Sequence, residues 1–222
     1  MREAGEPLAG AFIVVEGTDG SGTTTQRDLL GRALAARNVP VTATNEPSGG
    51  PVGKLIRQLL VTGASDPYLD WTTMALLFAA DRADHVARTV RPALERGELV
   101  VSDRYDLSSM IYQSLTARSD ADALPWIREL NCHALRPDLT LVIDVSPATA
   151  LARRRARGGT EEVYEAAPLQ ERLAAAYLDA ERFLPGDRIV HVDGSGSVDA
   201  VARAILAAVE AALPGLPVRG PA

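Results

Sequence analysis

Five short, almost wholly apolar runs alternate along the chain with longer stretches in which apolar residues recur at helical spacing. The runs are the segments 11–16, 41–44, 99–102, 139–144 and 189–192. Strands of this kind are buried on both faces, as in a parallel sheet that helices cover on each side. We therefore predict an α/β fold of three layers, with a five-stranded parallel sheet between two layers of helices.

The stretches between the runs carry the helical pattern. It begins soon after the first run, at Leu29, and returns in five later segments, which are 52–60, 74–86, 148–157, 168–183 and 198–213. The chain has 222 residues and no internal repeat or linker, so we expect one domain over 1–222. Its Pro/Gly-rich tail, about 214–222, is expected to be frayed.

The composition excludes several classes of protein. The chain has 23 basic and 29 acidic residues, a net charge of −6, which argues against nucleic-acid binding through a basic surface. No apolar run is long enough to span a membrane, and the first ten residues do not resemble a secretory signal. The only cysteine, Cys132, can form no internal disulfide, so we expect a cytoplasmic protein.

Polar and glycine-rich segments follow three of the predicted strands. They are Gly17–Thr25, Glu46-Pro47 and Asp103-Arg104-Tyr105. In open parallel sheets, ligands bind beyond the carboxyl ends of the strands. We therefore expect these three segments to meet around one ligand site.

The first of these segments has the spacing of a phosphate-binding loop, G-x-x-x-x-G-K-[ST], with Thr23 in place of the lysine. Such glycines let backbone N–H groups surround phosphate oxygens at the N-terminus of the next helix, and Thr24 provides the hydroxyl that binds Mg²⁺. The other interpretation is a glycine-rich turn that joins a strand to a helix. The predicted ATP-binding residues are Gly17, Thr18, Asp19, Gly20, Ser21, Gly22, Thr23, Thr24 and Thr25.

A series of motifs resembles the thymidylate kinase family, which are P-loop nucleoside monophosphate kinases. The motifs occur in the family's order over about 12–183, and they are the segments 12–22, Glu46-Pro47 with Gly49-Gly50, Leu77–Arg82 with His85, Asp103-Arg104-Tyr105 with Tyr112-Gln113, and Pro137–Thr140 with Asp144. The resemblance implies a P-loop NTP hydrolase-type fold and the transfer of a phosphoryl group from ATP to dTMP, giving dTDP and ADP for dTTP synthesis. It also implies Mg²⁺ as cofactor and a homodimer formed through helices near Phe78 and the segment after Tyr105.

The resemblance assigns roles on the acceptor side. Phe78 stacks on thymine, although an aromatic residue in an apolar helix is also typical of a core. Arg82 donates to a thymine carbonyl, unless it forms a surface salt bridge with Asp81 or Asp84. Arg57 and Arg104 bind the 5′-phosphate through a planar fork. The predicted dTMP-binding residues are Glu46, Pro47, Arg57, Phe78, Arg82, Arg104, Tyr105, Tyr112 and Gln113, of which the two tyrosines crowd the 2′ position of the sugar.

An arginine-rich helix followed by Gly158-Gly159 resembles the entrance to the family's lid, which we place at about 153–167. A solvated basic helix face is the other interpretation. Because Thr23 carries no charge, Arg153 and Arg157 are the leading substitutes for the missing lysine. The predicted catalytic residues are Asp19, Asp103, Arg104, Arg153 and Arg157, with Asp103 orienting the acceptor phosphate or a metal-bound water.

The chain departs from the family at two other points. Asn45 stands where an arginine often precedes Glu-Pro, and Glu162-Val163-Tyr164-Glu165 lacks the Asp-Arg pair usual in the lid. Two further functions therefore remain open. One is a kinase for another nucleotide or deoxynucleotide, and the other is a nucleotide-binding protein whose catalysis is weakened by the loss of the lysine.

Overall fold

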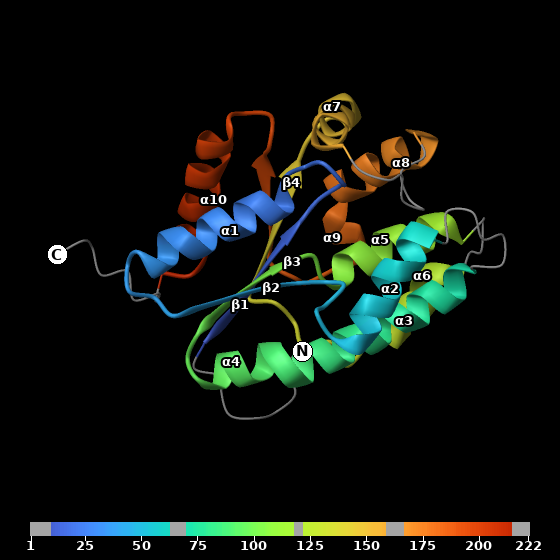
Figure 1. Ribbon diagram of the computed structural model, residues 1–222, viewed down its shortest axis with the longest axis horizontal. Helices are drawn as coiled ribbons and strands as arrows, with labels where there is room; N and C mark the ends of the chain where they lie inside the picture. Colours follow the sequence, from blue (N-terminus) through green and yellow to red (C-terminus); the bar gives the residue numbers. More distant parts are fainter. Residues whose placement is uncertain (1–9, 63–69, 118–121, 159–166, 215–222) are drawn as a thin grey trace.

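The computed structural model describes residues 10–62, 70–117, 122–158 and 167–214, and of Thr62, Arg157 and Ala167 it describes only the backbone. Five parallel strands form one sheet in the order β2-β3-β1-β4-β5 (Figure 1). The strands are β1 (Ala11–Glu16), β2 (Val41–Asn45), β3 (Leu99–Asp103), β4 (Leu139–Asp144) and β5 (Ile189–Asp193). The predicted five-stranded parallel sheet is confirmed, and three strands extend one residue beyond the predicted runs.

The strands are buried on both faces, as their apolar sequences require. Ile13 of β1 packs on one face against α1 (Thr23–Ala35) and α10 (Val198–Ala212). Phe12 packs on the other face against η2 (Val86–Val90), a π-helical turn, and α4 (Arg91–Glu95). Figure 1 shows α1 and α10 on the opposite side of the sheet from α4. The alternation of side chains along a strand thus divides β1 between two cores.

A second group of helices lies beside the sheet and has its own apolar core, which includes Ile56, Met74, Ile111 and Leu173. The helices are α2 (Pro51–Thr62), α3 (Trp71–His85), α5 (Asp106–Thr116), α6 (Ala123–Leu130), α8 (Ala167–Leu178) and α9 (Ala180–Phe183). In Figure 1 this group lies to the right of the sheet, with α7 (Pro147–Arg157) above it. It therefore forms a wall next to the carboxyl ends of β1 and β3.

Three details differ from the sequence prediction. Two helices, α5 and α6, occupy a stretch to which we assigned no element. The predicted helix 168–183 divides at Asp179, whose N–H bonds three residues back to the carbonyl of Ala176, a tightening typical of a helix end. The helix predicted to end at Val86 continues through η2 into α4. None of the described helices is long and apolar enough to cross a membrane.

The predicted single domain over 1–222 stays a prediction. The second half of the predicted lid, including Glu162-Val163-Tyr164-Glu165, and residues 215–222 of the predicted tail lie outside the described residues.

Candidate functional site

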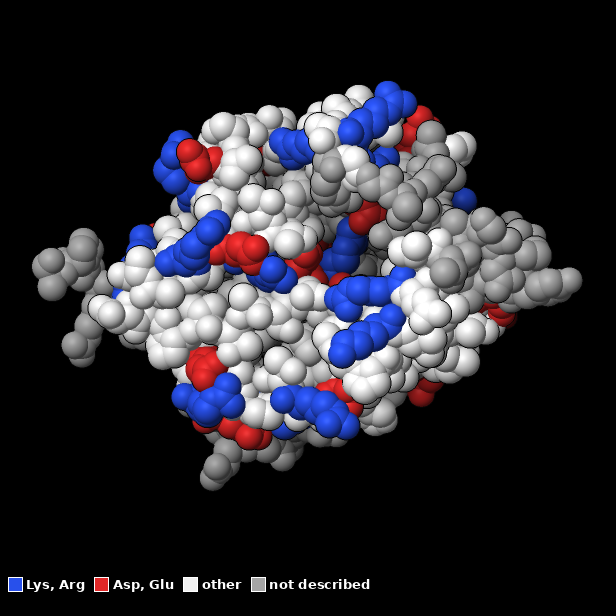
Figure 2. Space-filling model, in the orientation of Figure 1, with Lys and Arg blue, Asp and Glu red and all other residues white. Residues whose placement is uncertain are grey.

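Two cavities lie side by side at the carboxyl ends of β1 and β3, and Figure 2 shows basic and acidic side chains around a hollow on this face. The glycine-loop cavity is lined by residues 19–26, Asp103, Arg104, Arg153, Arg154, Gly194, Gly196, Val198 and Val201. The helical cavity is lined by Asp19, Thr24, Arg27, Asn45, Glu46, Pro47, Arg57, Leu60, Phe78, Asp103, Arg104, Ser108, Ser109, Tyr112 and Gln113. Four residues line both cavities, and they are Asp19, Thr24, Asp103 and Arg104.

The loop between β1 and α1 folds tightly against α7. Gly20 has φ +92°, and a Cβ on it would lie 2.4 Å from the carbonyl oxygen of Ala150. Gly22 has φ +100° where α1 begins. Both positions therefore require glycine, and the loop ends on a helix N-terminus, where backbone N–H groups attract anions. The predicted loop residues from Asp19 to Thr25 line the cavity, whereas Gly17 and Thr18 are not among its lining residues.

Thr24 and Asp103 meet at the boundary of the two cavities. The Thr24 hydroxyl donates to Oδ2 of Asp103, a side chain that is largely buried. Oδ1 of Asp103 is buried and has no hydrogen-bond partner among the described residues. A hydroxyl and a carboxylate oxygen are ligands that Mg²⁺ prefers, so this pair fits the predicted metal.

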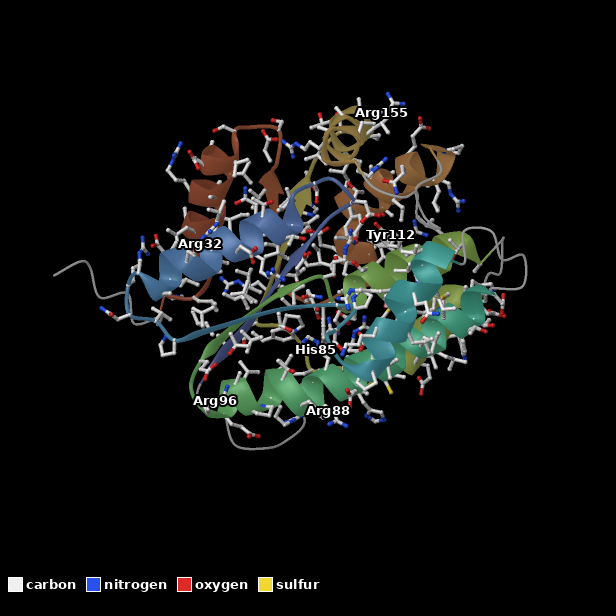
Figure 3. The ribbon with its side chains drawn as sticks, viewed as in Figure 1. Arg32, His85, Arg88, Arg96, Tyr112 and Arg155 are labelled. Atoms are coloured by element: carbon white, nitrogen blue, oxygen red, sulfur yellow. The ribbon has the colours of Figure 1, made fainter. Side chains whose placement is uncertain are left out.

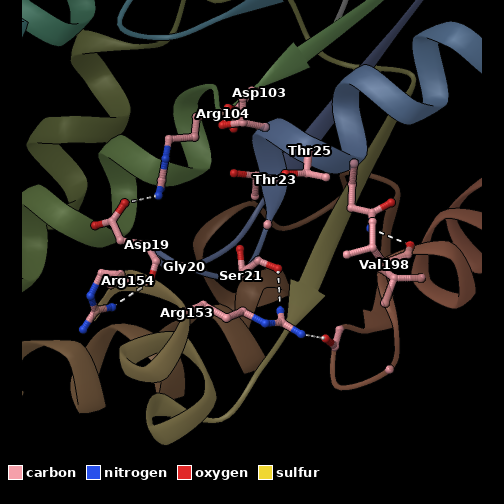
Figure 4. Close-up of a pocket in the computed structure, with 16 residues that line it drawn as sticks. Asp19, Gly20, Ser21, Thr23, Thr25, Asp103, Arg104, Arg153, Arg154 and Val198 are labelled. Atoms are coloured by element: carbon pink, nitrogen blue, oxygen red, sulfur yellow. Dashed lines mark hydrogen bonds and ion pairs between the residues drawn. The ribbon is translucent and has the colours of Figure 1, made fainter. Parts of the chain in front are cut away.

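Thr23 is buried in the first turn of α1 and brings no charge to the loop. Two arginines of α7 do reach the loop (Figure 4). Arg153 donates to the carbonyl of Ser21 at 3.1 Å and to that of Gly194 at 2.8 Å. Arg154 donates to the carbonyl of Asp19 at 2.6 Å. Arg153 therefore contacts the glycine loop, and its catalytic role stays a prediction, while the side chain of Arg157 lies outside the described residues.

Arg154 is a site residue that our sequence interpretation did not select. Its position follows from helical geometry, because Ala150 contacts Gly20 and residues three and four positions later lie on the same helix face. The loop therefore faces both Arg153 and Arg154, whereas Arg155 is exposed and points away from the loop (Figure 3). The spacing within α7 would have identified Arg154 once the contact of Ala150 was known.

Arg104 is the most strongly held cation of the site. It donates from Nη2 to Oδ1 of Asp19 at 2.6 Å, and from Nη1 to Ser108 Oγ and to Tyr177 Oη at 3.0 and 3.1 Å. Its guanidinium carbon lies 5.4 Å from the ring centroid of Tyr112, whose hydroxyl donates to the other oxygen of Asp19. The arrangement fixes the predicted residues Asp19, Arg104 and Tyr112 as one unit between the cavities.

Glu16, the last residue of β1, lies behind Arg104 and is fully buried. One carboxylate oxygen accepts the N–H groups of Tyr105 and Ser108, and the other accepts the hydroxyls of Ser108 and Tyr177. Burial raises the pKa of Glu16 to about 7, although the positive charge of Arg104 acts in the opposite direction. Sequence reasoning gave Glu16 no role, and the only signal is an acid at the end of an otherwise apolar strand.

The helical cavity contains most of the predicted acceptor residues. Phe78 of α3 lines it and is half-buried, and it also packs against the core of the helical group; stacking on a base stays a prediction. Arg57 of α2 is exposed to the cavity and donates to the carbonyls of Pro47 and Ser48. Gln113 is buried, and its side-chain oxygen has no hydrogen-bond partner among the described residues.

The structure corrects the expectation for Arg82. This side chain is 2% exposed and is not among the residues that line either cavity. It forms a salt bridge of 2.8 Å with Glu46 and donates to Asn131, to the carbonyl of Tyr105 and to Ser109 Oγ. The alternative of a surface salt bridge with Asp81 or Asp84 is therefore wrong. Contact with a base stays a prediction, because Arg82 does not line the helical cavity itself and contacts Glu46 and Ser109, which do.

The prediction that Tyr105 crowds a sugar is wrong. The side chain is 1% exposed and packs edge-on against Phe12, with 5.0 Å between the ring centroids. It belongs to the core between the sheet and α4 and lines neither cavity. The ring of Tyr105 packs into the core, and the sequence motif does not predict this burial. Tyr112, in contrast, lines the helical cavity.

Glu46 is held in a buried cluster. It forms a salt bridge with Arg82 and lies 3.0 Å from Nδ1 of His85, whose other ring nitrogen contacts Thr44 Oγ1. Figure 3 labels His85 at this position, where α3 passes the end of β2. Glu46 and Pro47 thus line the helical cavity, and the buried cluster around Glu46 holds this part of the wall in place. Arg27 of α1 lines the same cavity and donates to the carbonyl of Thr44, a position that our sequence interpretation did not select.

Comparisons with known proteins identify what this arrangement resembles. The family model described as "Thymidylate kinase" matches residues 15–205. The chain is 41% identical over 203 residues to the thymidylate kinase of Symbiobacterium thermophilum, which covers 91% of this chain and 94% of that protein. It is 40% identical over 199 residues to the thymidylate kinase of Ruegeria pomeroyi, with 87% and 91% covered. It is 37% identical over 206 residues to the probable thymidylate kinase of Thermococcus gammatolerans, with 90% and 96% covered.

Proposed function

The chain belongs to the thymidylate kinase family, and we propose that its two cavities divide the substrates, with ATP in the glycine-loop cavity and dTMP in the helical cavity. The protein is a nucleoside monophosphate kinase, which transfers the γ-phosphoryl group of ATP to dTMP and gives dTDP and ADP. The relatives do not favour a kinase for another nucleotide or a non-catalytic nucleotide-binding protein.

One observation carries the division of substrates. The two cavities share Asp19, Thr24, Asp103 and Arg104, so a phosphate that enters from either side meets the same four residues. Phosphoryl transfer needs an attacking and a leaving oxygen roughly in line, with little covalent chemistry from the protein. A shared boundary between two nucleotide sites provides this geometry. It places the transferred group where backbone N–H groups and Arg104 neutralise charge.

The polar character of the two cavities supports their assignment. The glycine-loop cavity is lined by the N-terminus of α1 and by the glycines of the loop. Their backbone N–H groups suit a chain of phosphates. The helical cavity combines the aromatic face of Phe78 with the cations Arg57 and Arg104, which suit a base and a single phosphate. In this proposal Tyr112 limits the space at the sugar, and Gln113 offers an unpaired oxygen to the nucleotide.

We propose that Thr24 and Asp103 hold the Mg²⁺ that accompanies ATP. The unpaired, buried Oδ1 of Asp103 and the hydroxyl that bonds its other oxygen supply an oxygen donor set that suits this ion. When bound, Mg²⁺ supplies positive charge to the phosphate oxygens. Arg153 and Arg154 supply the charge that Thr23 lacks, since both donate to carbonyls of the glycine loop.

We also propose a cytoplasmic homodimer that forms through α2 and α3. These neighbouring helices leave large apolar side chains exposed to solvent, with Leu55 at 44%, Val61 at 47% and Leu76 at 52%. Covering them against a second copy removes this apolar surface from water. Light scattering on the purified protein tests the oligomeric state. We expect the mass of a dimer for the unaltered chain and the mass of a monomer for Leu76→Asp.

A pair of variants tests the division of substrates in steady-state assays with ATP, Mg²⁺ and dTMP. Phe78→Ala is expected to raise the KM for dTMP about ten-fold or more and to leave the KM for ATP unchanged, because it removes a stacking face from the helical cavity. Val198→Asp places a charge beside phosphates in the glycine-loop cavity and is expected to raise only the KM for ATP. The reverse pattern would contradict the assignment. The unaltered enzyme is expected to prefer dTMP over dCMP and dGMP.

A further inference from the structure

Arg104 uses most of its hydrogen-bonding capacity within the protein. A guanidinium group has five N–H donors in a rigid fork. Among the described residues, Ser108 and Tyr177 accept both donors of Nη1, and Asp19 accepts one donor of Nη2. Tyr112 is a further hydrogen-bond partner of this guanidinium, which lines both cavities. A guanidinium that is held in one orientation at the edge of a cavity suits a bidentate contact with a phosphate.

The acceptors that hold Nη1 are themselves held from behind. The hydroxyls of Ser108 and Tyr177 each donate to Oε2 of Glu16, at 2.6 and 3.2 Å, and they lie 2.9 Å from one another. Both hydroxyl oxygens also accept from Nη1 of Arg104, so they lie between the carboxylate and the guanidinium and link the two groups. Oε1 of Glu16 accepts two backbone N–H groups, which fixes the carboxylate in turn.

Arg104 also has a backbone conformation that needs support. Its φ is +68°, in the left-handed region that residues other than glycine rarely adopt. Its N–H donates to the carbonyl of Val15, and its own carbonyl accepts from the hydroxyl of Ser102. Strained residues of this kind persist at functional sites only where the surroundings determine them fully. The polar groups around Arg104 therefore set the direction of its side chain.

We propose that Tyr177 and Glu16 are positioning residues for the acceptor phosphate, and that they act by fixing the orientation of the Arg104 guanidinium at the edge of the helical cavity. Tyr177 belongs to α8, whereas Glu16 ends β1 and Arg104 follows β3. Three elements distant in the sequence thus meet behind one cation. The proposal rests on the acceptor role of Arg104 that is proposed above.

Tyr177→Phe is the decisive variant, because it removes one hydroxyl and keeps the ring, which packs edge-on against Tyr112. Binding of dTMP and of thymidine, which lacks the phosphate, is measured by calorimetry for the unaltered protein, Tyr177→Phe, Arg104→Ala and the double variant. Ser114→Ala is the matched control, since it removes a hydroxyl of α5 that donates to its own helix. Thermal unfolding of each protein reports on folding.

Tyr177→Phe is expected to raise the Kd for dTMP about ten-fold and to leave the Kd for thymidine unchanged. The reason is that the hydroxyl acts through the charge-assisted contact between Arg104 and the phosphate, which thymidine lacks. In kinetics the KM for dTMP rises and the KM for ATP does not. In the Arg104→Ala background the same change is expected to have no further effect, which is the mark of two residues that act through one interaction. Ser108→Ala, which removes the second hydroxyl, is expected to give the same selective loss.

Three results would overturn the proposal. They are unchanged dTMP binding by Tyr177→Phe, an equal loss for thymidine and dTMP, and an undiminished effect of Tyr177→Phe in the Arg104→Ala background. Failure of the acceptor assignment gives a different pattern, because then the unaltered protein binds thymidine as tightly as dTMP and Arg104→Ala changes neither.

Discussion

Replacement of the buried acid Glu16 by glutamine is expected to change how the stability of the protein depends on pH. Glu16 has a pKa of about 7 in the folded protein, against a usual value of 4.5, because burial penalises its charged form. A group whose pKa is raised by folding favours the folded state at low pH, and this contribution is lost as the pH rises through the folded pKa. Glu16→Gln keeps the size and shape of the side chain and cannot ionise.

The expected magnitude follows from the two pKa values. Between pH 5 and pH 8, ionisation of Glu16 lowers the free energy of unfolding by about 2.5 kcal/mol, since one pKa unit corresponds to about 1.4 kcal/mol and part of the shift is already felt at pH 5. The side chain is fully buried, so solvent screening does not reduce this figure. All other groups titrate alike in both proteins, and the difference between them isolates Glu16.

Urea unfolding at pH 5 and pH 8 measures this difference. The free energy of unfolding of the unaltered protein should fall by about 2.5 kcal/mol more than that of Glu16→Gln over this interval. Glu98→Gln is the control, because Glu98 is an acid distant from the site that bonds Arg96 and Thr42. Equal pH dependence in the unaltered protein and Glu16→Gln would refute the reasoning, since Glu16 would then ionise at its ordinary pKa in the fold.

Three further predictions concern the glycine loop and the supports of the site. Arg153→Ala is expected to lower kcat about 100-fold with little change in the KM for dTMP, whereas Arg155→Ala, at an exposed position, is expected to leave kcat unchanged. Equal effects of the two variants in steady-state assays would contradict a role for Arg153 at the loop. Gly20→Ala is expected to raise the KM for ATP, because φ +92° and the carbonyl of Ala150 leave no room for a Cβ, and an unchanged KM would show that the loop adapts. Arg82→Ala is expected to destabilise the protein by about 3–5 kcal/mol in urea unfolding, since it leaves the carboxylate of Glu46 buried with less compensation, and a loss below about 1 kcal/mol would refute this.

The site could be predicted from the sequence where the signal is local. The glycine spacing of the loop, the hydroxyl of Thr24 and the position of Asp103 and Arg104 at a strand end all follow from a few adjacent residues. The roles of Arg82, Tyr105, Arg154 and Glu16 did not follow in this way, because each depends on residues distant in the sequence. Arg82, for example, is buried because Glu46 and Asn131 reach it from other elements.

The sequence by itself determined the five strands, the helices that flank most of them and the end of the sheet at which the two cavities lie. These features depend on apolar periodicity and on the backbone freedom of glycine, which act within one element. Only the tertiary structure decided which side chain of each helix faces the site. Tyr177 and Glu16 are separated by 161 residues and still share a hydrogen bond behind Arg104. Helical spacing gives the face on which a residue lies, but packing decides what that face contacts, because a buried polar group is stable only where another element supplies its partner.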